Sequence, residues 1–212
     1  MLKLTHRVLK TLAAFALFGL MSGTAEAGPP LICHPFDAGT APLLPWGPGP
    51  GWNSPDRSYD IQRLTADTLQ LLTPTTPVLA RMEIMRRATI YAGLNKQDKK
   101  VAAALLKALL DRAKALPQDS RDPMPWFDAG YLIESYKQNE HTAGFNMLAS
   151  LSGSPDGYGH VRKAIQLAGQ NAAMEFAASL MTSGSAAAEH RRHALAGAPA
   201  GSLLAKNLAT IQ

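Results

Sequence analysis

The stretch KVAAALLKALLDRAKAL, residues 100–116, decides the fold class of this 212-residue chain. Alanine, leucine and lysine dominate it, and these residues are strong helix formers. Its large apolar residues recur at helical spacing, at Val101, Leu105, Leu109 and Leu116. The predicted helix ends before Pro117, because proline disfavours the helical conformation of the residue before it. No segment shows a convincing two-residue alternation, so we predict an all-α fold.

A recurring device marks the helix starts: a Ser, Thr or Asp followed by proline. The side-chain oxygen caps an unpaired backbone N–H, and proline at the first helical position loses a donor that had no partner. The four pairs are Ser54-Pro55, Thr76-Pro77, Asp122-Pro123 and Ser154-Pro155. With the apolar spacing, they predict helices over residues 54–73, 76–92, 95–116, 126–139, 161–180, 186–196 and 203–211, and a weaker one over 143–151. We expect Gly93 to cap the second helix and Gly184 to interrupt the chain after the long helix over 161–180.

Consecutive helices joined by short loops are expected to pack as antiparallel hairpins, either in a closed bundle or in a short solenoid. The segments 54–93 and 95–139 are each about forty residues long, a length typical of helix-hairpin repeats. The stretch Trp126 to Leu132 resembles the aromatic-small-aromatic face of a tetratricopeptide-type helix. That resemblance implies a solenoid, whereas the helix lengths alone are compatible with either architecture.

The first 27 residues have the three parts of a secretory signal peptide. Lys3, Arg7 and Lys10 precede an apolar block of about ten residues, and Ala25-Glu26-Ala27 is a small-x-small cleavage site. The block is shorter than the roughly 20 residues that a spanning helix needs, and we identify no integral membrane span later in the chain. We therefore predict cleavage near Ala27 and a soluble secreted or periplasmic product.

Residues 28–53 are predicted to form an extended arm ahead of a helical domain over 54–212. Eight of the fifteen prolines lie between Pro29 and Pro55, and four glycines accompany them, which excludes regular helix. The arm also carries several large apolar side chains, Trp46 and Trp52 among them. A solvated linker would not need these, so we expect the arm to pack against the helical body.

The composition narrows the classes of partner. Removal of the leader leaves 18 basic and 15 acidic residues, a net charge of +3 without a dense basic stripe, so we expect no nucleic-acid binding. Cys33 is the one cysteine and cannot form an internal disulfide. It would permit a Cys33-linked dimer. A protein partner is the class that we expect, and no motif calls for a cofactor.

Two short motifs carry a family resemblance. The chain resembles exported bacterial helical proteins that have an ICHPF stretch, here residues 32–36, and an LPWG stretch, here residues 44–47. In those proteins the stretches precede a helix like residues 81–88, and the resemblance covers about the first half of the chain. It implies export and a helical body, and it implies no activity.

Two sets of residues have the chemistry of metal ligands. Cys33 and His34 would suit a metal or a haem, although c-type haem attachment needs a further cysteine three residues before this one. His190 and His193 lie three residues apart on a predicted helix and would share an ion with His160 or with a carboxylate such as Glu189. Each set also has an interpretation without a metal. Cys33 and His34 would be structural residues of a packed arm, and His190 and His193 would belong to an exposed basic turn.

Glu134 is the candidate catalytic residue. It stands before Ser135 in a run that superficially resembles the Glu-Ser step of lytic transglycosylases, whose glutamate protonates a glycosidic oxygen of the bacterial wall. Such an acid needs an apolar setting, which Phe127 and Tyr131 would provide. The family's later Gly-Leu-Met-Gln-like segment is missing, so a solvated helix position is the competing interpretation.

The leading hypothesis is a non-enzymatic exported scaffold that acts through protein contacts. The candidate binding residues are aromatic, because aromatic faces offer a large contact area with polar edges. They are Trp46, Trp52, Trp126, Phe127 and Tyr131. The alternatives are a wall-cleaving enzyme that uses Glu134 and a metal- or haem-binding protein that uses Cys33 and His34.

Overall fold

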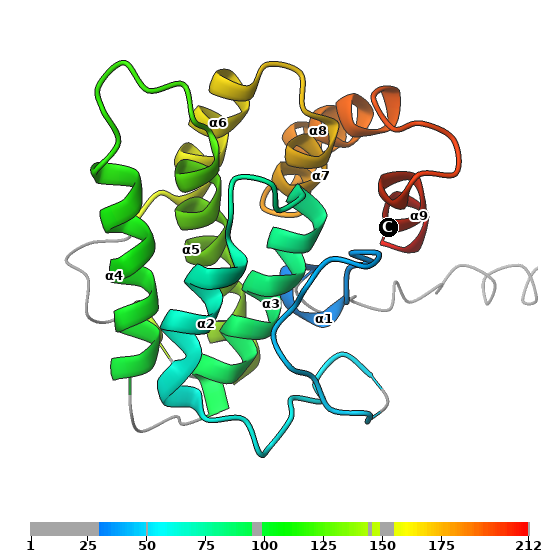
Figure 1. Cartoon of the computed structure of the whole chain (residues 1–212). Helices are drawn as coiled ribbons and strands as arrows, with labels where there is room; N and C mark the ends of the chain where they lie inside the picture. The colour runs from blue at the N-terminus through cyan, green and yellow to red at the C-terminus, as the bar shows by residue number, and fades with distance from the viewer. Residues whose placement is uncertain (1–29, 50, 95–98, 144–145, 149–154, 212) are drawn as a thin grey trace, which may run out of the picture.

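The computed structural model of the chain describes residues 30–49, 51–94, 99–143, 146–148 and 155–211. Within these residues all regular structure is helical, which confirms the all-α prediction (Figure 1). The elements are α1 (Pro30–Cys33), the 3-10 helix η1 (Ile61–Arg63), α2 (Leu64–Leu71), α3 (Val78–Leu94), α4 (Lys100–Lys114), α5 (Met124–Ala143), α6 (Gly157–Ala168), α7 (Ala172–Ser179), α8 (Gly184–Ala196) and α9 (Leu203–Thr210). The predicted leader lies outside the described residues.

The helices form a bundle around one core. α5 packs against α3, α4 and α6, and α3 also contacts α7, so the packing is not limited to neighbours along the chain. The core cluster extends from Leu31 in the arm to Ile211 at the end of α9. Figure 1 shows α4 at one edge of the bundle and α8 and α9 at the other. A solenoid would restrict contacts to consecutive repeats, so the bundle is the observed architecture.

α3 is the central helix, and it is buried almost all round. From Val78 to Ala92 every residue except Arg87 is buried. The sequence pattern predicted one buried stripe on this helix, through Val78, Met82, Met85 and Thr89. The difference arises because the other faces of α3 are covered by the arm and by α5, and because the charged side chains on those faces are paired.

Several predicted helix boundaries are wrong. Ser54-Pro55 does not start a helix, since regular structure begins at Ile61 and the carboxylate of Asp60 caps it. The long helix over 161–180 is two helices, because Gly169 takes a φ of 71° and Asn171 caps a new start. Gly184 opens α8 instead of ending the helix before it. Gly93 lies inside α3.

Other predicted helix boundaries are confirmed, or they concern residues that the structure does not describe. The α4 helix covers the predicted stretch and ends before Pro117, and Asp122 accepts a hydrogen bond from the N–H of Met124 at the start of α5. The first four residues of the helix predicted over 95–116 and most of the weak segment 143–151 lie outside the described residues. Ser154 lies outside them too, and Asp156 caps α6.

The arm lies against the body, but it is not extended throughout. Pro30 opens the single-turn helix α1, where Leu31 and Ile32 are fully buried. Proline suits a first helical position because its missing N–H would have had no partner there. The other end of the chain also holds the arm: the side chain of Asn207 in α9 accepts from the N–H of Asp37 and donates to its carbonyl.

Candidate functional site

A buried cluster of charges on α3 holds the arm. Arg86 donates from Nε and Nη2 to the two carboxylate oxygens of Glu83 over 2.8 and 2.9 Å. Glu83 also accepts from Nε of Arg87 over 2.7 Å and from the backbone N–H of Phe36 over 3.0 Å. The Glu83 and Arg86 side chains are 1% and 0% exposed. Burial of charges is tolerated here because the carboxylate is surrounded by donors.

The guanidinium groups of this cluster bind the arm through its backbone. Arg86 donates to the carbonyls of Ile32 and Trp52, and Arg87 donates to the carbonyl of Leu44. Farther along α3, the Tyr91 hydroxyl donates to the carbonyl of Pro45 and accepts from the N–H of Asp56. We call Glu83, Arg86, Arg87 and Tyr91 the arm clamp. An irregular chain without sheet or helix partners needs such side-chain donors for its carbonyls.

Trp46 completes the clamp. The guanidinium carbons of Arg86 and Arg87 lie 4.9 and 5.2 Å from the centre of its ring, and the Tyr91 ring meets it edge-on at 5.8 Å. Cations over an indole face are attracted by its negative quadrupole. Trp46 therefore anchors the arm from within. Both arm tryptophans are half-buried, but Trp46 packs against the core cluster and Trp52 does not, so the two rings have different roles.

A second buried ion pair joins α3 to α5. Arg81 donates to Asp128 over 2.6 Å, and both side chains are 1% exposed. Burial raises the pKa of Asp128 to about 6, against the opposing effect of the Arg81 charge. The other carboxylate oxygen of Asp128 has no hydrogen-bond partner among the described residues. This half-satisfied carboxylate is under the surface and reaches no pocket that we find.

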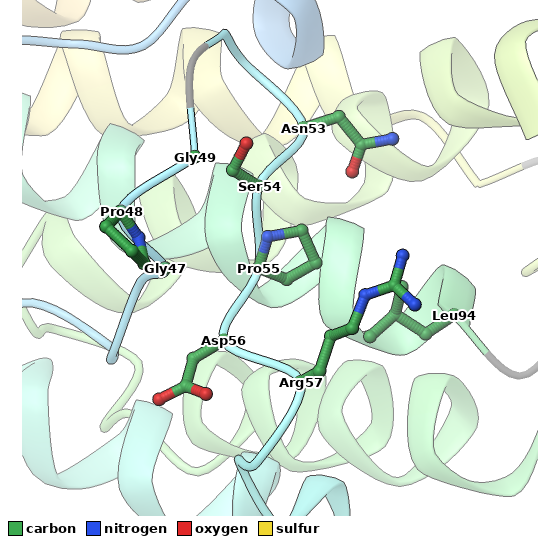
Figure 2. Close-up of a pocket in the computed structure, with 9 residues that line it drawn as sticks. All are labelled: Gly47, Pro48, Gly49, Asn53, Ser54, Pro55, Asp56, Arg57 and Leu94. Atoms are coloured by element: carbon green, nitrogen blue, oxygen red, sulfur yellow. The ribbon is translucent and has the colours of Figure 1, made fainter.

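The clamped arm leaves a cavity of about 690 Å³ at its turn, which we call the arm pocket. Its lining comes from residues 47–49, residues 53–57 and Leu94 at the end of α3. Figure 2 shows Arg57 directed to the same side of the arm as Leu94, with the carboxylate of Asp56 on the opposite side. Ser58 donates twice to Asp56, from its N–H and its hydroxyl, and these hydrogen bonds lower the pKa of that carboxyl.

Two side chains that line the arm pocket, Leu94 and Arg57, are exposed. Leu94 is 48% exposed and is one of the two large apolar side chains that are exposed in the described part of the chain. Arg57 is exposed, and its guanidinium makes neither an ion pair nor a hydrogen bond with the residues that the structure describes. The arm pocket therefore offers an apolar contact next to an unneutralised positive charge.

The five predicted binding aromatics do not share one surface. Phe127 and Tyr131 stack as expected, with ring centres 5.6 Å apart, but both are fully buried, so they cannot contact a partner in this state. Trp126 is half-buried on α5, where its ring contacts His160 and the ammonium group of Lys163 at 5.4 and 3.4 Å. Trp52 is half-buried and directly precedes Asn53, which lines the arm pocket.

Glu134 has a local structural function. Its Oε1 accepts from the ammonium group of Lys137 over 2.8 Å and from the N–H of Tyr158 in the first turn of α6 over 3.0 Å. These contacts join the carboxylate to its own helix and to the start of α6. Glu134 lines none of the cavities described here.

The predicted metal ligands do not converge. No group of three or more His, Cys, Asp or Glu side chains in the described residues is placed to hold an ion. Cys33 is half-buried at the end of α1, and burial raises the pKa of its thiol although Arg86 acts in the opposite direction. A lone thiol gives no support for a Cys33-linked dimer. His160 binds the carbonyl of Asp156 instead of approaching the other histidines.

His190 and His193 meet a carboxylate that sequence reasoning missed. His190 Nδ1 lies 2.5 Å from Oε2 of Glu175 on α7, and its Nε2 lies 2.7 Å from the hydroxyl of Tyr158 on α6. His193 Nδ1 lies 3.7 Å from Oε1 of the same carboxylate. The predicted partner Glu189 faces Arg192 instead. No local signal could have identified Glu175, because the three helices are brought together only by tertiary packing.

Comparison with known proteins returned no relatives: no protein-family model matches the chain, and neither a curated protein nor a solved structure shows significant similarity to it. None of the helices in the described residues has both the length and the apolar character needed to cross a membrane.

Proposed function

We propose that this chain is an exported helical scaffold that binds another protein through the arm pocket and acts without catalysis. The observation that carries the proposal is the arm clamp. Side chains of α3 bind the arm backbone at Leu44, Pro45 and Trp52, so residues 47–49 and 53–57 are held beside Leu94. A surface that is already ordered loses little conformational entropy on binding.

The chemistry of the arm pocket specifies the partner's class. An exposed leucine favours an apolar side chain, and an unpaired guanidinium favours a carboxylate beside it. The carboxylate of Asp56 lies on the opposite side of the arm from Leu94, where Ser58 donates to its Oδ1 (Figure 2). The proposed ligand is a protein segment with an acidic residue next to an apolar one. The half-exposed ring of Trp52 would extend the contact.

Selection from a peptide-display library on the purified protein tests this proposal. We expect enriched peptides to share an acidic-apolar pair. In fluorescence anisotropy, Arg57→Glu and Leu94→Ser should each weaken their binding at least about tenfold, a typical effect for loss of a charged or apolar anchor. The matched controls are Arg121→Glu and Leu195→Ser, which alter an exposed arginine and an exposed leucine elsewhere.

The control variants decide the outcome. If the four variants bind alike, or if no peptide is enriched, the arm pocket is not the interaction surface. Release of soluble fragments from purified peptidoglycan, with loss of that activity in Glu134→Gln, would replace the scaffold proposal with the enzyme alternative.

Export is tested separately. Expression of the full chain in a bacterium with an outer membrane should yield a processed periplasmic form. N-terminal sequencing of this form should start at Gly28, as expected from the small-x-small site at Ala25 to Ala27. An unprocessed cytoplasmic product would contradict the predicted leader.

A further inference from the structure

A second cavity, of about 550 Å³, lies where α6 ends, α7 starts and α8 ends. Gly169 turns the chain between α6 and α7 with a φ of 71°, and Gly197 follows α8 so close to α7 that a Cβ there would lie 2.7 Å from Cβ of Ala172. We call this cavity the α7 pocket. Its volume falls within the range of roughly 300 to 1,000 Å³ that is usual for small-molecule sites.

The walls of the α7 pocket are mixed. Ile165, Ala172 and Ala196 supply apolar surface, and the side-chain amides of Gln166 and Gln170 supply polar groups at the rim. Both glutamines are exposed and make no hydrogen bond with the described residues. A ligand can therefore contact an apolar wall and still find acceptors at the mouth.

The one charged carboxylate of the α7 pocket is Glu175, whose side chain is 12% exposed. Its Oε2 is occupied by Nδ1 of His190 over 2.5 Å. Its Oε1 lies on the side of His193, which also lines the pocket, but the separation of 3.7 Å exceeds hydrogen-bond distance. Oε1 thus remains an acceptor without a hydrogen bond from the described residues, next to an open cavity.

His193 does not form a hydrogen bond with Oε1 of Glu175. Arg192 lies with its Nη2 3.0 Å from Nε2 of His193 and can only donate, so Nε2 accepts. The ring proton of the neutral form is then on Nδ1, which faces Oε1, but the separation of 3.7 Å is too long for a hydrogen bond. The His193 side chain is 43% exposed. The charge of Arg192 is turned toward Glu189, 3.8 Å away and 65% exposed.

We propose that the α7 pocket binds a primary alkylammonium group, with Oε1 of Glu175 as its acceptor and the apolar wall along its methylene chain. An ammonium fits better than a guanidinium, because the fork of a guanidinium needs both oxygens of a carboxylate and His190 already holds one. The remaining ammonium donors reach the amide oxygens of Gln166 or Gln170. The source is a free amine or a lysine side chain of another protein.

The test is an NMR titration of the full protein with n-pentylammonium, its neutral analogue n-pentanol, and n-pentylguanidinium. We expect the ammonium to shift the amide signals of Gly169, Gln170 and Gly197 and to bind at least about tenfold more tightly than the alcohol, the effect of one charge-assisted hydrogen bond. The guanidinium should bind more weakly than the ammonium. Equal affinity for the alcohol and the ammonium would overturn the proposal.

Two pairs of variants locate the site. Glu175→Gln should remove the preference for the ammonium, whereas Glu189→Gln makes the same change in net charge on exposed surface and should retain it. Ala196→Phe should block the pocket without removing any hydrogen bond, whereas Ala188→Phe, at an exposed position on the same helix, should not. Loss of binding in a control variant, or none in Ala196→Phe, would contradict the assignment.

Nα-acetyl-lysine amide distinguishes the two sources. Binding comparable with that of n-pentylammonium identifies a lysine side chain as the ligand. Its exclusion while n-pentylammonium still binds identifies a free amine, and either result leaves the ammonium site in place. None of these measurements involves the arm pocket, so their failure and that of the proposed scaffold function are independent.

Discussion

Arg86 forms a bidentate ion pair with Glu83, one turn earlier on α3. Two nitrogens of its guanidinium donate to the two oxygens of the carboxylate, and both side chains are buried. The remaining donor of Arg86 binds arm carbonyls. The pair therefore links the stability of α3 to the position of the arm.

Glu83→Ala is expected to destabilise the protein by about 3–5 kcal/mol, because it leaves the Arg86 charge buried without its counter-ion. Urea denaturation followed by circular dichroism measures the change. Arg63→Ala is the control, since Arg63 pairs with Asp67 on the surface and should contribute less than about 1 kcal/mol. Similar effects of the two variants would show that the clamp is not a stabilising unit.

Trp46→Ala and Trp52→Ala should distinguish the tryptophan that anchors the arm to the core from the one that does not. The guanidinium groups of Arg86 and Arg87 lie over the Trp46 ring, and removal of this ring should lower the free energy of unfolding by about 3 kcal/mol. Trp52→Ala should cost less than about 1 kcal/mol, as for most surface positions. Limited proteolysis should cut the arm between residues 38 and 56 faster in Trp46→Ala only. The reverse order would contradict the placement of the two rings.

The buried carboxyl group of Asp128 should make the stability of the protein depend on pH. Burial raises its folded-state pKa to about 6, above the unfolded value of about 4. Between these values the native state binds a proton that the unfolded state does not, so this group stabilises the fold as pH falls from about 7 to about 4. Relative to Asp128→Asn, the wild type should gain roughly 1 kcal/mol per pH unit across that window. Denaturation of both proteins at pH 7 and pH 5 measures the difference, and a constant difference would contradict the raised pKa.

Glu134→Ala should reduce stability by about 1–3 kcal/mol, because the N–H of Tyr158 at the start of α6 loses a charged acceptor. Glu189→Ala is the matched control, an exposed glutamate on α8 whose nearest cation is 3.8 Å away, and it should have little effect. Thermal unfolding of the two variants provides the comparison. A stable Glu134→Ala would leave this side chain without a structural explanation.

Gly130→Ala tests the crossing of α5 and α6. A Cβ at this position would lie 2.5 Å from the carbonyl oxygen of Gly157 and 2.9 Å from Val161, and backbone atoms cannot move away cheaply. We expect a loss of about 3 kcal/mol from overpacking. Gly93→Ala meets one side-chain atom, Nδ2 of Asn139 at 3.0 Å, and should stay within about 1 kcal/mol of wild type. Equal stabilities would show that the two helices can separate without loss.

Local patterns predicted the elements better than their junctions. α4 is held by its own residue preferences and by one apolar stripe, and its bounds follow from residues 100–116. The break at Gly169 was missed because the apolar spacing continues across it from Val161 to Leu180, and a single positive φ there redirects the chain. Phe127 and Tyr131 of the predicted binding set are buried, and their spacing in the sequence is the same whether they face a groove or a core.

The amino-acid sequence by itself determined that this protein is helical and where most of its helices lie, since helical periodicity and caps act over a few residues. It also showed an arm too apolar to be a linker. Only the tertiary structure decided which residues meet: Glu83 with the N–H of Phe36, Arg86 with the carbonyls of Ile32 and Trp52, and His190 with Glu175 and Tyr158 from two other helices. Contacts of this kind join residues tens of positions apart, and their energies depend on burial that no local pattern contains.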